Sequence, residues 1–541
     1  MVNAELFLNQ DKLDAQGRIL TLLLKRQTYQ LQSEVLERFF SLSRRNTNKE
    51  GVSIFNRYYL LRLLNLVLNN YEIKDHDDTN PNHELNFLKS YLIVAQEANE
   101  GFELDQDTYS QTDWFRKNTW PIALIQVEAN KPLNPISTMI KGQVLFNHLL
   151  HNSCYSEQTK EFLKSRNIIH AHNYILGICH LIGAAFKKPE KSTFYPFSIE
   201  KTETLSFFLE SFSVNIQGFR NHDKSNDFYR AIKETPLFPF DEKSLLVLDW
   251  NLFGNKLYQG LLFDIYKNSK ISEVPKFKSF LKFKDYTSLE VIEKTLLKNI
   301  VLSLFDKKHG DVKFDDSNKE GFPDAYVRVG KRIFLFEIKD SFFKSEAIFS
   351  RDYKTIKEEI DKKYNSQNPK PRGVFQLLNS ISRLNDGQLD TAIFHDIGIK
   401  QRNTIIYPIL IFTDINFSAP GIARYLTEEF DKQIDNTSFS KSFQQVKPLS
   451  FIGLDFLLEN LDLLSKPRTS FQECLEYYFI QMKKRIKNLD KRYKDQDIFL
   501  ANEPFEQVVI DFLENDQIRN YTEFMFDKFE LGNGLTNHEN N

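Results

Sequence analysis

Apolar residues recur at helical spacing through the first segment of the chain, residues 1–115. Leu31, Val35 and Phe39 fall on one helical face. A polar loop, DHDDTNPNHE, follows, and a further apolar helix begins near Leu85. This pattern predicts a helical N-terminal domain. The segment contains no catalytic constellation, so we expect it to serve as a packing module or to bind a partner.

The second segment, residues 116–275, mixes helical and strand-like patterns. β-branched and aromatic residues over 120–127 and 244–250 predict strands, and the latter run leads into a turn and a helix. Histidines gather in the same segment, and the first two stand one helical turn apart: His148, His151, His170, His172 and His180. No carboxylate stands at a tight ligand spacing beside them. Core or surface histidines therefore fit the pattern better than a metal site does.

The third segment, residues 276–465, alternates helices and strands. Residues 288–305 predict an amphipathic helix with Ser288 as its N-cap. An apolar run over 404–413 predicts a strand buried on both faces, although Pro408 favours an edge or a bulge. The other expected elements are helices over 373–384, 420–433 and 454–464 and a strand over 448–453, with 310–314 as a candidate extra strand. This order predicts an α/β core in which helices cover a mixed sheet.

Residues 321–340 predict a β-hairpin inside this third segment. β-branched and aromatic residues flank a two-residue connection, Gly330 and Lys331. Because the glycine stands first, the connection suits a type II′ turn. Such a turn fixes the register of the hairpin, so Val329 should face Arg332.

That register brings two carboxylates and a lysine to one face of the hairpin. Counting outward from the turn places Asp324 opposite Glu337, and Lys339 lies two residues further along the same face. Facing carboxylates repel each other, but Mg²⁺ offsets that cost because it takes carboxylate oxygens, waters and substrate phosphate oxygens. A nearby ammonium can orient an attacking water, or take its proton if the pKa of the lysine is depressed. This group of residues suits hydrolysis of a phosphodiester.

The helix over 288–305 offers a further carboxylate. Its apolar positions, among them Ile292 and Leu296, place Glu293 near the middle of the apolar stripe and Glu290 at its edge. A carboxylate on a buried face is costly unless it is paired or bound to a cation. The alternative is a rotated helix on which Glu293 is solvated.

These residues resemble the motif of the PD-(D/E)XK nuclease superfamily. Pro323 and Asp324 match its first element, and Glu337, Ile338 and Lys339 match its second. The resemblance covers most of the third segment. It implies a restriction-endonuclease-like core with the element order αβββαβ and a Mg²⁺ cofactor that Mn²⁺ would replace. It also implies that the two carboxylates and the backbone carbonyl of Ile338 hold the metal.

The same resemblance gives roles to the two flanking helices. In this superfamily the helix before the hairpin often supplies another acidic metal ligand, and Glu293 fits that position, with Glu290 in reserve. The helix after the lysine strand often carries a polar residue such as glutamine, and Gln376 matches loosely. Its implied role is to orient a phosphate or the catalytic Lys339. The alternative is a glutamine at the edge of a helix.

Charge and composition narrow the class of partner. The formal net charge is −2 over 541 residues, so nucleic-acid binding would have to rest on local patches. Residues 274–285 interleave lysine with phenylalanine, which suits either contact with a phosphate backbone or a half-buried strand. Residues 482–494 hold seven Lys or Arg against one Asp, which suits either a helix that follows a phosphate backbone or a solvated helix face.

Cysteine usage and hydropathy bear on the compartment. Cys154, Cys179 and Cys474 are far apart, which argues for a reducing compartment and against a zinc ribbon or a disulfide scaffold. The first residues do not resemble a signal peptide, and no apolar run approaches the ~20 residues that span a bilayer. We therefore expect a cytoplasmic protein without a membrane partner.

Together these features predict a multidomain α+β protein. The expected parts are a helical N-terminal domain (1–115), a mixed α/β middle region (116–275), a nuclease-like domain (276–465) and a basic helical extension with a disordered tail (466–541). The expected function is Mg²⁺-dependent cleavage of nucleic acid, DNA by superfamily frequency, in restriction or anti-phage defence by analogy. A homodimer or a partner protein would engage the N-terminal half. Two alternatives stay open: an inactive nuclease-fold protein that binds nucleic acid, and a helical scaffold with an accidental motif match.

Overall fold

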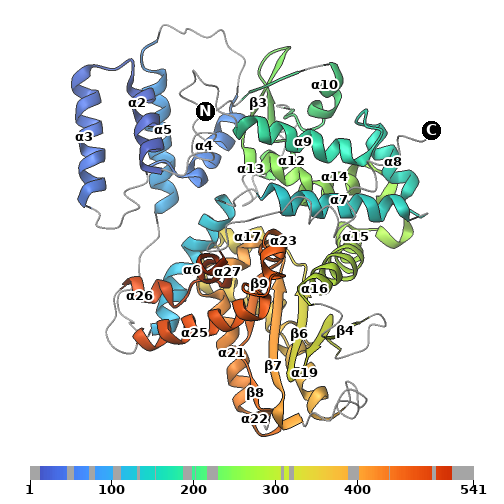
Figure 1. Ribbon diagram of the computed structural model, residues 1–541. Coiled ribbons are helices and arrows are strands. Elements are labelled where there is room, and N and C mark those ends of the chain that lie inside the picture. The colour runs from blue at the N-terminus through green and yellow to red at the C-terminus, as the bar shows by residue number, and fades with distance from the viewer. Residues whose placement is uncertain are drawn as a thin grey trace. The chain divides into compact units, whose positions relative to one another are not determined.

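The computed structural model divides the chain into two compact units. Unit 1 comprises residues 1–104, 129–135 and 158–269, and unit 2 comprises 105–128, 136–157 and 270–541. The chain passes from unit 1 to unit 2 for the last time at residue 270, close to the boundary expected at 275. The boundary expected at 115 falls inside helix α6 (Gln111–Ala129) (Figure 1). The structure describes residues 12–45, 54–71, 80–100, 111–130, 134–152, 154–186, 198–201, 203–215, 230–305, 310–315, 322–387, 401–437, 439–489 and 495–513. The expected disordered tail lies outside these residues.

Unit 1 is mainly helical, which confirms the helical character predicted for the N-terminal segment. Its helices are α2 (Lys12–Leu24), α3 (Tyr29–Arg45), α4 (Arg57–Asn69), α5 (His83–Asn99), α8 (Ser156–Lys164), α9 (Ala171–Phe186), α10 (Glu203–Glu210), α12 (Arg230–Glu234), α13 (Trp250–Gly254), η1 (Asn255–Leu257) and α14 (Gln259–Asn268).

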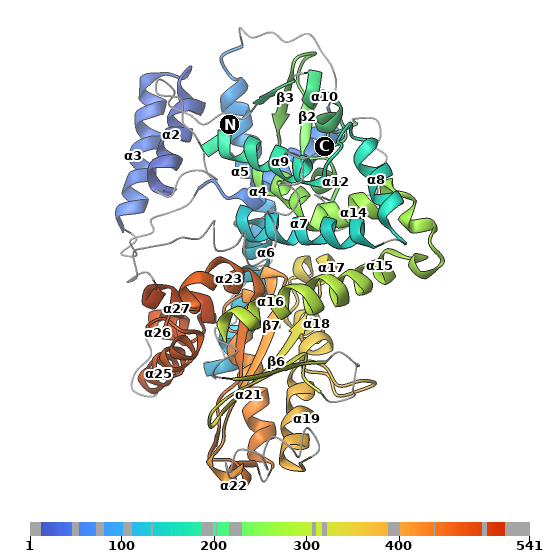
Figure 2. The same ribbon diagram turned by 45° about the vertical axis from the view of Figure 1, so that its right-hand side comes forward.

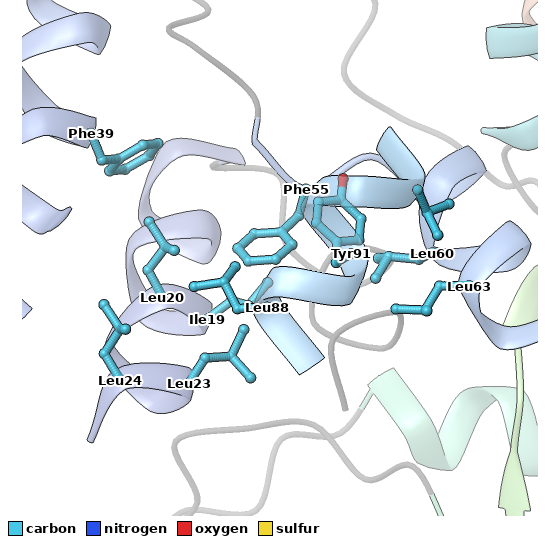
Figure 3. Close-up of a cluster of buried hydrophobic side chains, with 11 residues drawn as sticks. Ile19, Leu20, Leu23, Leu24, Phe39, Phe55, Leu60, Leu63, Leu88 and Tyr91 are labelled. Carbon is cyan, nitrogen blue, oxygen red and sulfur yellow. The ribbon is translucent and has the colours of Figure 1, made fainter. Parts of the chain in front are cut away.

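Helices α2, α4 and α5 enclose one apolar cluster. In Figure 3 the rings of Phe55 and Tyr91 lie next to each other above Leu88 and Ile19, and the ring centroids are 5.1 Å apart. The buried Gln16 pairs with the backbone of Phe55, donating to its carbonyl at 3.2 Å and accepting from its amide at 2.9 Å. The cluster explains why these helices form together, since an amphipathic helix gains most of its stability from packing.

A small antiparallel sheet completes unit 1. Strands β1 (Ser198–Glu200), β3 (Ser244–Val247) and β2 (Leu237–Pro239) lie in the order β1-β3-β2. The strand expected over 244–250 is therefore confirmed as far as Val247. It ends because Asp249 caps helix α13, accepting from the amide of Leu252 at 2.9 Å, and Asp249 also forms a buried ion pair with Arg57.

Unit 2 contains a mixed sheet, as predicted for the third segment. Its strands are β4 (Asp311–Phe314), β5 (Ala325–Val329), β6 (Arg332–Lys339), β7 (Ile405–Phe412), β8 (Gln445–Val446) and β9 (Ser450–Gly453). The order is β4-β5-β6-β7-β8, with β9 also paired to β7. Strands β4 to β6 are antiparallel, whereas β7 runs parallel to β6, β8 and β9. The candidate strand over 310–314 is thus confirmed.

Helices surround this sheet, and α19 and α21 pack along it (Figure 2). The helices of unit 2 are α6, α7 (Pro135–His151), η2 (Lys270–Glu273), η3 (Pro275–Phe277), α15 (Phe280–Thr287), η4 (Ser288–Leu297), α16 (Lys298–Leu304), α17 (Ser345–Phe349), α18 (Tyr353–Tyr364), α19 (Val374–Asn385), η5 (Gln401–Asn403), η6 (Ile415–Ser418), α21 (Ile422–Asp435), α22 (Phe439–Ser442), α23 (Leu454–Glu459), α24 (Leu461–Leu464), α25 (Phe471–Leu489), α26 (Asp495–Leu500) and α27 (Phe505–Leu513). The helices expected over 373–384, 420–433 and 454–464 are present, the last with a break at Asn460.

The helix before the hairpin begins earlier than expected. Its N-cap is Ser279, whose hydroxyl accepts from the amide of Lys282 at 3.4 Å, and α15 continues through the π-helix η4 into α16. The prediction of Ser288 as N-cap is therefore wrong, because Ser288 lies inside a continuous helix. The strand alternative for 274–285 is wrong as well, since Phe283 and Thr287 are buried at helical spacing.

Two further predictions about strands are wrong. Residues 120–127 belong to helix α6, where Trp120, Leu124 and Glu128 are buried at a spacing of four despite the strand-like composition. Pro408 lies in the central strand β7 rather than at an edge. Its missing amide is tolerated because it falls between the part of β7 that pairs with β8 and the part that pairs with β9.

Candidate active site

The hairpin has the predicted turn and register. Gly330 has a φ of +57° and Lys331 has a negative φ, which is the combination of a type II′ turn. Val329 pairs with Arg332, and the pairing continues outward to Ala325 and Phe336. The next position outward brings Asp324 opposite Glu337, as the sequence predicted.

The structure brings Asp324, Glu337 and Lys339 together at the end of β6. Oδ2 of Asp324 accepts a hydrogen bond from the amide of Ile338 at 2.7 Å, and Nζ of Lys339 donates to Oε1 of Glu337 at 2.5 Å. Glu337 is only 1% exposed, whereas the side chain of Lys339 is 20% exposed. The lysine therefore connects the buried carboxylate with the solvent side of the site.

Glu293 reaches the same site from the π-helix η4. In this helix the buried residues come in pairs five apart, such as Ile292 and Leu297, because each turn is wider than in an α-helix. Glu293 is half-buried between these apolar positions, and it interacts electrostatically with Asp324. Glu290 forms an ion pair with Lys294 at 2.8 Å, and its reserve role as a metal ligand stays a prediction.

The site holds three carboxyl groups and one lysine, and its buried setting favours the protonated form of the carboxyl groups. Burial, followed by the Asp324 carboxylate, raises the pKa of Glu337 to about 8, and the same two causes raise the pKa of Glu293 to about 7. Burial also raises the pKa of Asp324. Burial lowers the pKa of Lys339, but Glu337 and Asp324 outweigh this effect, so the pKa of the lysine is raised overall. We call Glu293, Asp324 and Glu337 the acidic cluster.

Sequence reasoning missed one carboxylate beside this cluster. Phe314 of β4 pairs with Ala325, so Asp315 is the next residue outward on the same side as Asp324, and its amide donates to the carbonyl of Asp324 at 3.5 Å. The charge of Asp315 contributes to the raised pKa of both Asp324 and Glu293. The strand over 310–314 was identifiable, but no short turn in the sequence fixed its register against β5.

Gln376 has a local structural contact. Its amide oxygen accepts from the backbone amide of Gly373 at 2.9 Å, so the side chain caps the start of its own helix α19. This agrees with the alternative of a glutamine at a helix edge. A catalytic role for Gln376 stays a prediction.

The donor atoms at the end of β6 fit a hard divalent cation. Two carboxylates, Asp324 and Glu337, and the carbonyl of Ile338 are oxygen donors of the kind that Mg²⁺ takes together with waters and phosphate oxygens. A divalent cation would also offset the repulsion from Asp324 that, after burial, raises the pKa of Glu337. In the described part of the chain, no three His, Cys, Asp or Glu side chains are arranged to hold a metal ion. Ligation by Glu293 therefore stays a prediction.

The other candidate residues have contacts of their own. Nε2 of His148 lies 2.8 Å from the hydroxyl of Tyr286, Nδ1 of His151 lies 2.7 Å from the carbonyl of Asn147, and the rings of His170 and His172 stack. In the first basic stretch, Lys276, Lys278 and Lys282 are exposed and Lys284 is buried. The second is described as far as 489, with Lys483, Lys484 and Lys487 exposed.

Comparisons with known proteins add no assignment to this geometry. No protein-family model matches the chain, and no curated protein or solved structure is significantly similar to it. Among the described residues, no helix combines the length and the apolar character that crossing a bilayer requires.

Proposed function

We propose that this protein is a metal-dependent nuclease whose active site is built on Asp324, Glu337 and Lys339. The observation that carries the proposal is the meeting of two carboxylates and a lysine at the end of β6, in the register set by the hairpin turn. The order of elements around the site supports it as well. A helix, three antiparallel strands, further helices and a parallel strand follow each other as in the αβββαβ order of the resemblance.

Each side chain has a role that its environment favours. Asp324, Glu337 and the carbonyl of Ile338 would hold Mg²⁺ or Mn²⁺, with Glu293 assisting. A divalent cation in this position supplies Lewis-acid polarisation of the phosphoryl group and lowers the pKa of water. Lys339 keeps its proton because its pKa is raised, so it donates hydrogen bonds that orient the attacking water or a phosphate oxygen.

The reaction is hydrolysis of a phosphodiester. A water oxygen forms a bond to phosphorus and gives up one proton to solvent, the bond from phosphorus to the leaving 3′ oxygen breaks, and solvent water supplies the proton for that oxygen, so that no net proton is gained or lost in these steps. DNA is the first substrate to test, by superfamily frequency alone, and a role in restriction or anti-phage defence is an analogy with proteins of similar build. Exposed lysines on η3, α15 and α25 supply local positive charge for a phosphate backbone.

The test is cleavage of plasmid, linear and single-stranded DNA with Mg²⁺ or Mn²⁺ by the wild type and by Asp324→Ala and Lys339→Ala. The matched controls are Asp311→Ala and Lys331→Ala, which remove an exposed carboxylate and an exposed lysine from the same three-stranded part of the sheet. We expect each site variant to lose at least about 100-fold in kcat, because each removes a charged group that acts on the reacting phosphate. The controls should keep the wild-type rate.

Calorimetric titration with Mn²⁺ separates catalysis from binding alone. Cleavage by the wild type that both site variants lose would support the proposal. Binding of Mn²⁺ and DNA without turnover would favour an inactive nuclease-fold protein that binds nucleic acid. Cleavage that survives in both site variants would overturn the assignment of the site.

A further inference from the structure

The residue after the catalytic lysine is a buried aspartate with a full set of partners. The side chain of Asp340 is only 4% exposed. Its Oδ1 accepts from the hydroxyl of Thr413 at 2.7 Å, and its Oδ2 accepts from the hydroxyl of Ser288 at 2.7 Å. The ammonium of Lys284, which is itself 6% exposed, forms an ion pair with the same oxygen. Such a group is stable because the buried charges are paired and hydrogen-bonded.

These partners come from three separate elements of unit 2. Asp340 directly follows strand β6, Thr413 directly follows strand β7, and Lys284 and Ser288 mark the junction between α15 and η4. The network therefore links the ends of two neighbouring parallel strands to one point on the long helix. Through Lys284 and Ser288, this network joins the helix to the residue that follows β6 by an ion pair and a hydrogen bond.

The same two elements carry Glu293 and Glu337, two members of the acidic cluster. Glu293 lies five residues beyond Ser288 on η4, and Glu337 and Lys339 lie on the last three residues of β6. Apolar packing between η4 and the sheet is non-directional, so it does not fix the position of the helix along the strand. Hydrogen bonds of defined length and direction do fix it.

We propose that Asp340 is a positioning residue that holds the helix bearing Glu293 at a fixed place beside the strand bearing Glu337 and Lys339. The functional part of this inference rests on the proposed nuclease activity, whereas the anchoring can be measured without it. The role of Asp340 rests on its contacts with Lys284, Ser288 and Thr413. It acts through the placement of the acidic cluster, and Thr413 completes its hold on the sheet.

The activity test compares Thr413→Val, Thr413→Ser and Asp340→Asn. Valine keeps the shape of threonine and removes one hydrogen bond, so we expect kcat to fall about two- to tenfold. The KM for DNA should not change, and half-saturation with Mg²⁺ should need a higher concentration. Thr413→Ser keeps the hydroxyl and should restore the wild-type values. Asp340→Asn should lower kcat about 100-fold, the effect of a displacement of about 1 Å at a reacting centre.

The matched control is Thr427→Val on α21. The hydroxyl of Thr427 also donates partly buried hydrogen bonds, to the carbonyls of Ala423 at 2.9 Å and Leu449 at 3.1 Å. These partners do not belong to the Asp340 network. Its kcat and Mg²⁺ requirement should equal those of the wild type. Equal losses in Thr413→Val and Thr413→Ser, or a wild-type Mg²⁺ requirement in a folded Asp340→Asn variant, would overturn the inference.

Hydrogen exchange followed by mass spectrometry tests the anchoring alone. In Thr413→Val the amides of η4, residues 288–297, should exchange faster than in the wild type, while those of α21 should not change. Thr427→Val should leave η4 unchanged. If the wild type neither cleaves DNA nor binds Mn²⁺, the proposed function fails, but faster exchange in η4 still supports the anchoring role. Unchanged exchange in η4 would refute it.

Discussion

Replacement of Glu337 by glutamine should cost activity and improve stability at high pH. The side chain is almost fully buried among carboxylates, and three carboxylates with one ammonium would carry a net charge of −2 if all were ionised. Glutamine keeps the shape of the side chain and can still accept from Lys339, but it carries no charge. We therefore expect Glu337→Gln to abolish metal-dependent cleavage while it removes repulsion within the acidic cluster.

The magnitude follows from the raised pKa. The pKa of Glu337 is about 8 in the folded chain, against 4.5 for an ordinary glutamate. Between these values the folded state binds more protons than the unfolded state, so the free energy of unfolding falls as pH rises. The slope for one group is about 1.4 kcal/mol per pH unit, or about 2–3 kcal/mol between pH 5.5 and pH 7.5. Glu337→Gln has no carboxyl group to lose this proton. The free energy of unfolding of the variant minus that of the wild type should therefore rise by the same amount between pH 5.5 and pH 7.5.

The assay is urea unfolding at several pH values without and with Mg²⁺. Trp250 is the tryptophan of unit 1, whereas Trp114 and Trp120 belong to unit 2, so a Trp250→Phe background reports on the unit that holds the site. Mg²⁺ should stabilise the wild type most at pH 7.5, because it binds the ionised carboxylates. Glu337→Gln should show little stabilisation by Mg²⁺.

Glu506→Gln is the matched control for this experiment. Burial raises the pKa of Glu506 to about 7, and its carboxylate accepts from the amide of Gly453 at the end of β9, which lies two strands across the sheet from β6. Its replacement should also flatten the pH dependence of unfolding, but stabilisation by Mg²⁺ should remain that of the wild type. The prediction is wrong if the free energies of unfolding of Glu337→Gln and the wild type differ by the same amount at pH 5.5 and at pH 7.5.

Three further substitutions test the fold around the site. Gly373→Ala should destabilise unit 2 by about 3 kcal/mol in urea unfolding, because Gly373 has a φ of +54° and an added Cβ would press on the carbonyl of Tyr364; wild-type stability would contradict the strained turn. Ser279→Ala should cost about 1 kcal/mol through loss of the N-cap of α15, measured in the same way, and no cost would place the start of the helix elsewhere. Arg57→Met should cost about 3–5 kcal/mol in unit 1, followed by Trp250 fluorescence, because it leaves Asp249 charged and buried; a neutral effect would refute the buried ion pair.

Local sequence signals were sufficient for the hairpin. A two-residue loop with glycine first allows few turn types, and the turn fixes every pair that follows it. For this reason Asp324 and Glu337 could be placed opposite each other from the sequence alone. Strand β7 was also identifiable, because a strand buried on both faces is apolar along its whole length.

Two segments with the amino-acid composition of a strand form helices because their packing favours a helix. Residues 120–127 have the composition of a strand and include a proline, yet they form a helix because Trp120 and Leu124 are buried at helical spacing. The start of the helix at Phe280 was hidden because lysine and phenylalanine alternate there as in a half-buried strand. In both cases tertiary contacts outweigh the intrinsic preference of the residues.

The sequence by itself determined the hairpin, its register and the facing carboxylates with their lysine. The tertiary structure alone decided that Glu293 turns toward Asp324, that Asp315 comes beside it and that Asp340 joins three elements. The physical reason is sequence separation. A two-residue turn leaves the chain few ways to pair. The contacts of Asp340 join residues about 50 to 70 apart and depend on how whole helices and strands pack, and the sequence between Asp315 and Asp324 contains no short turn that would fix their pairing.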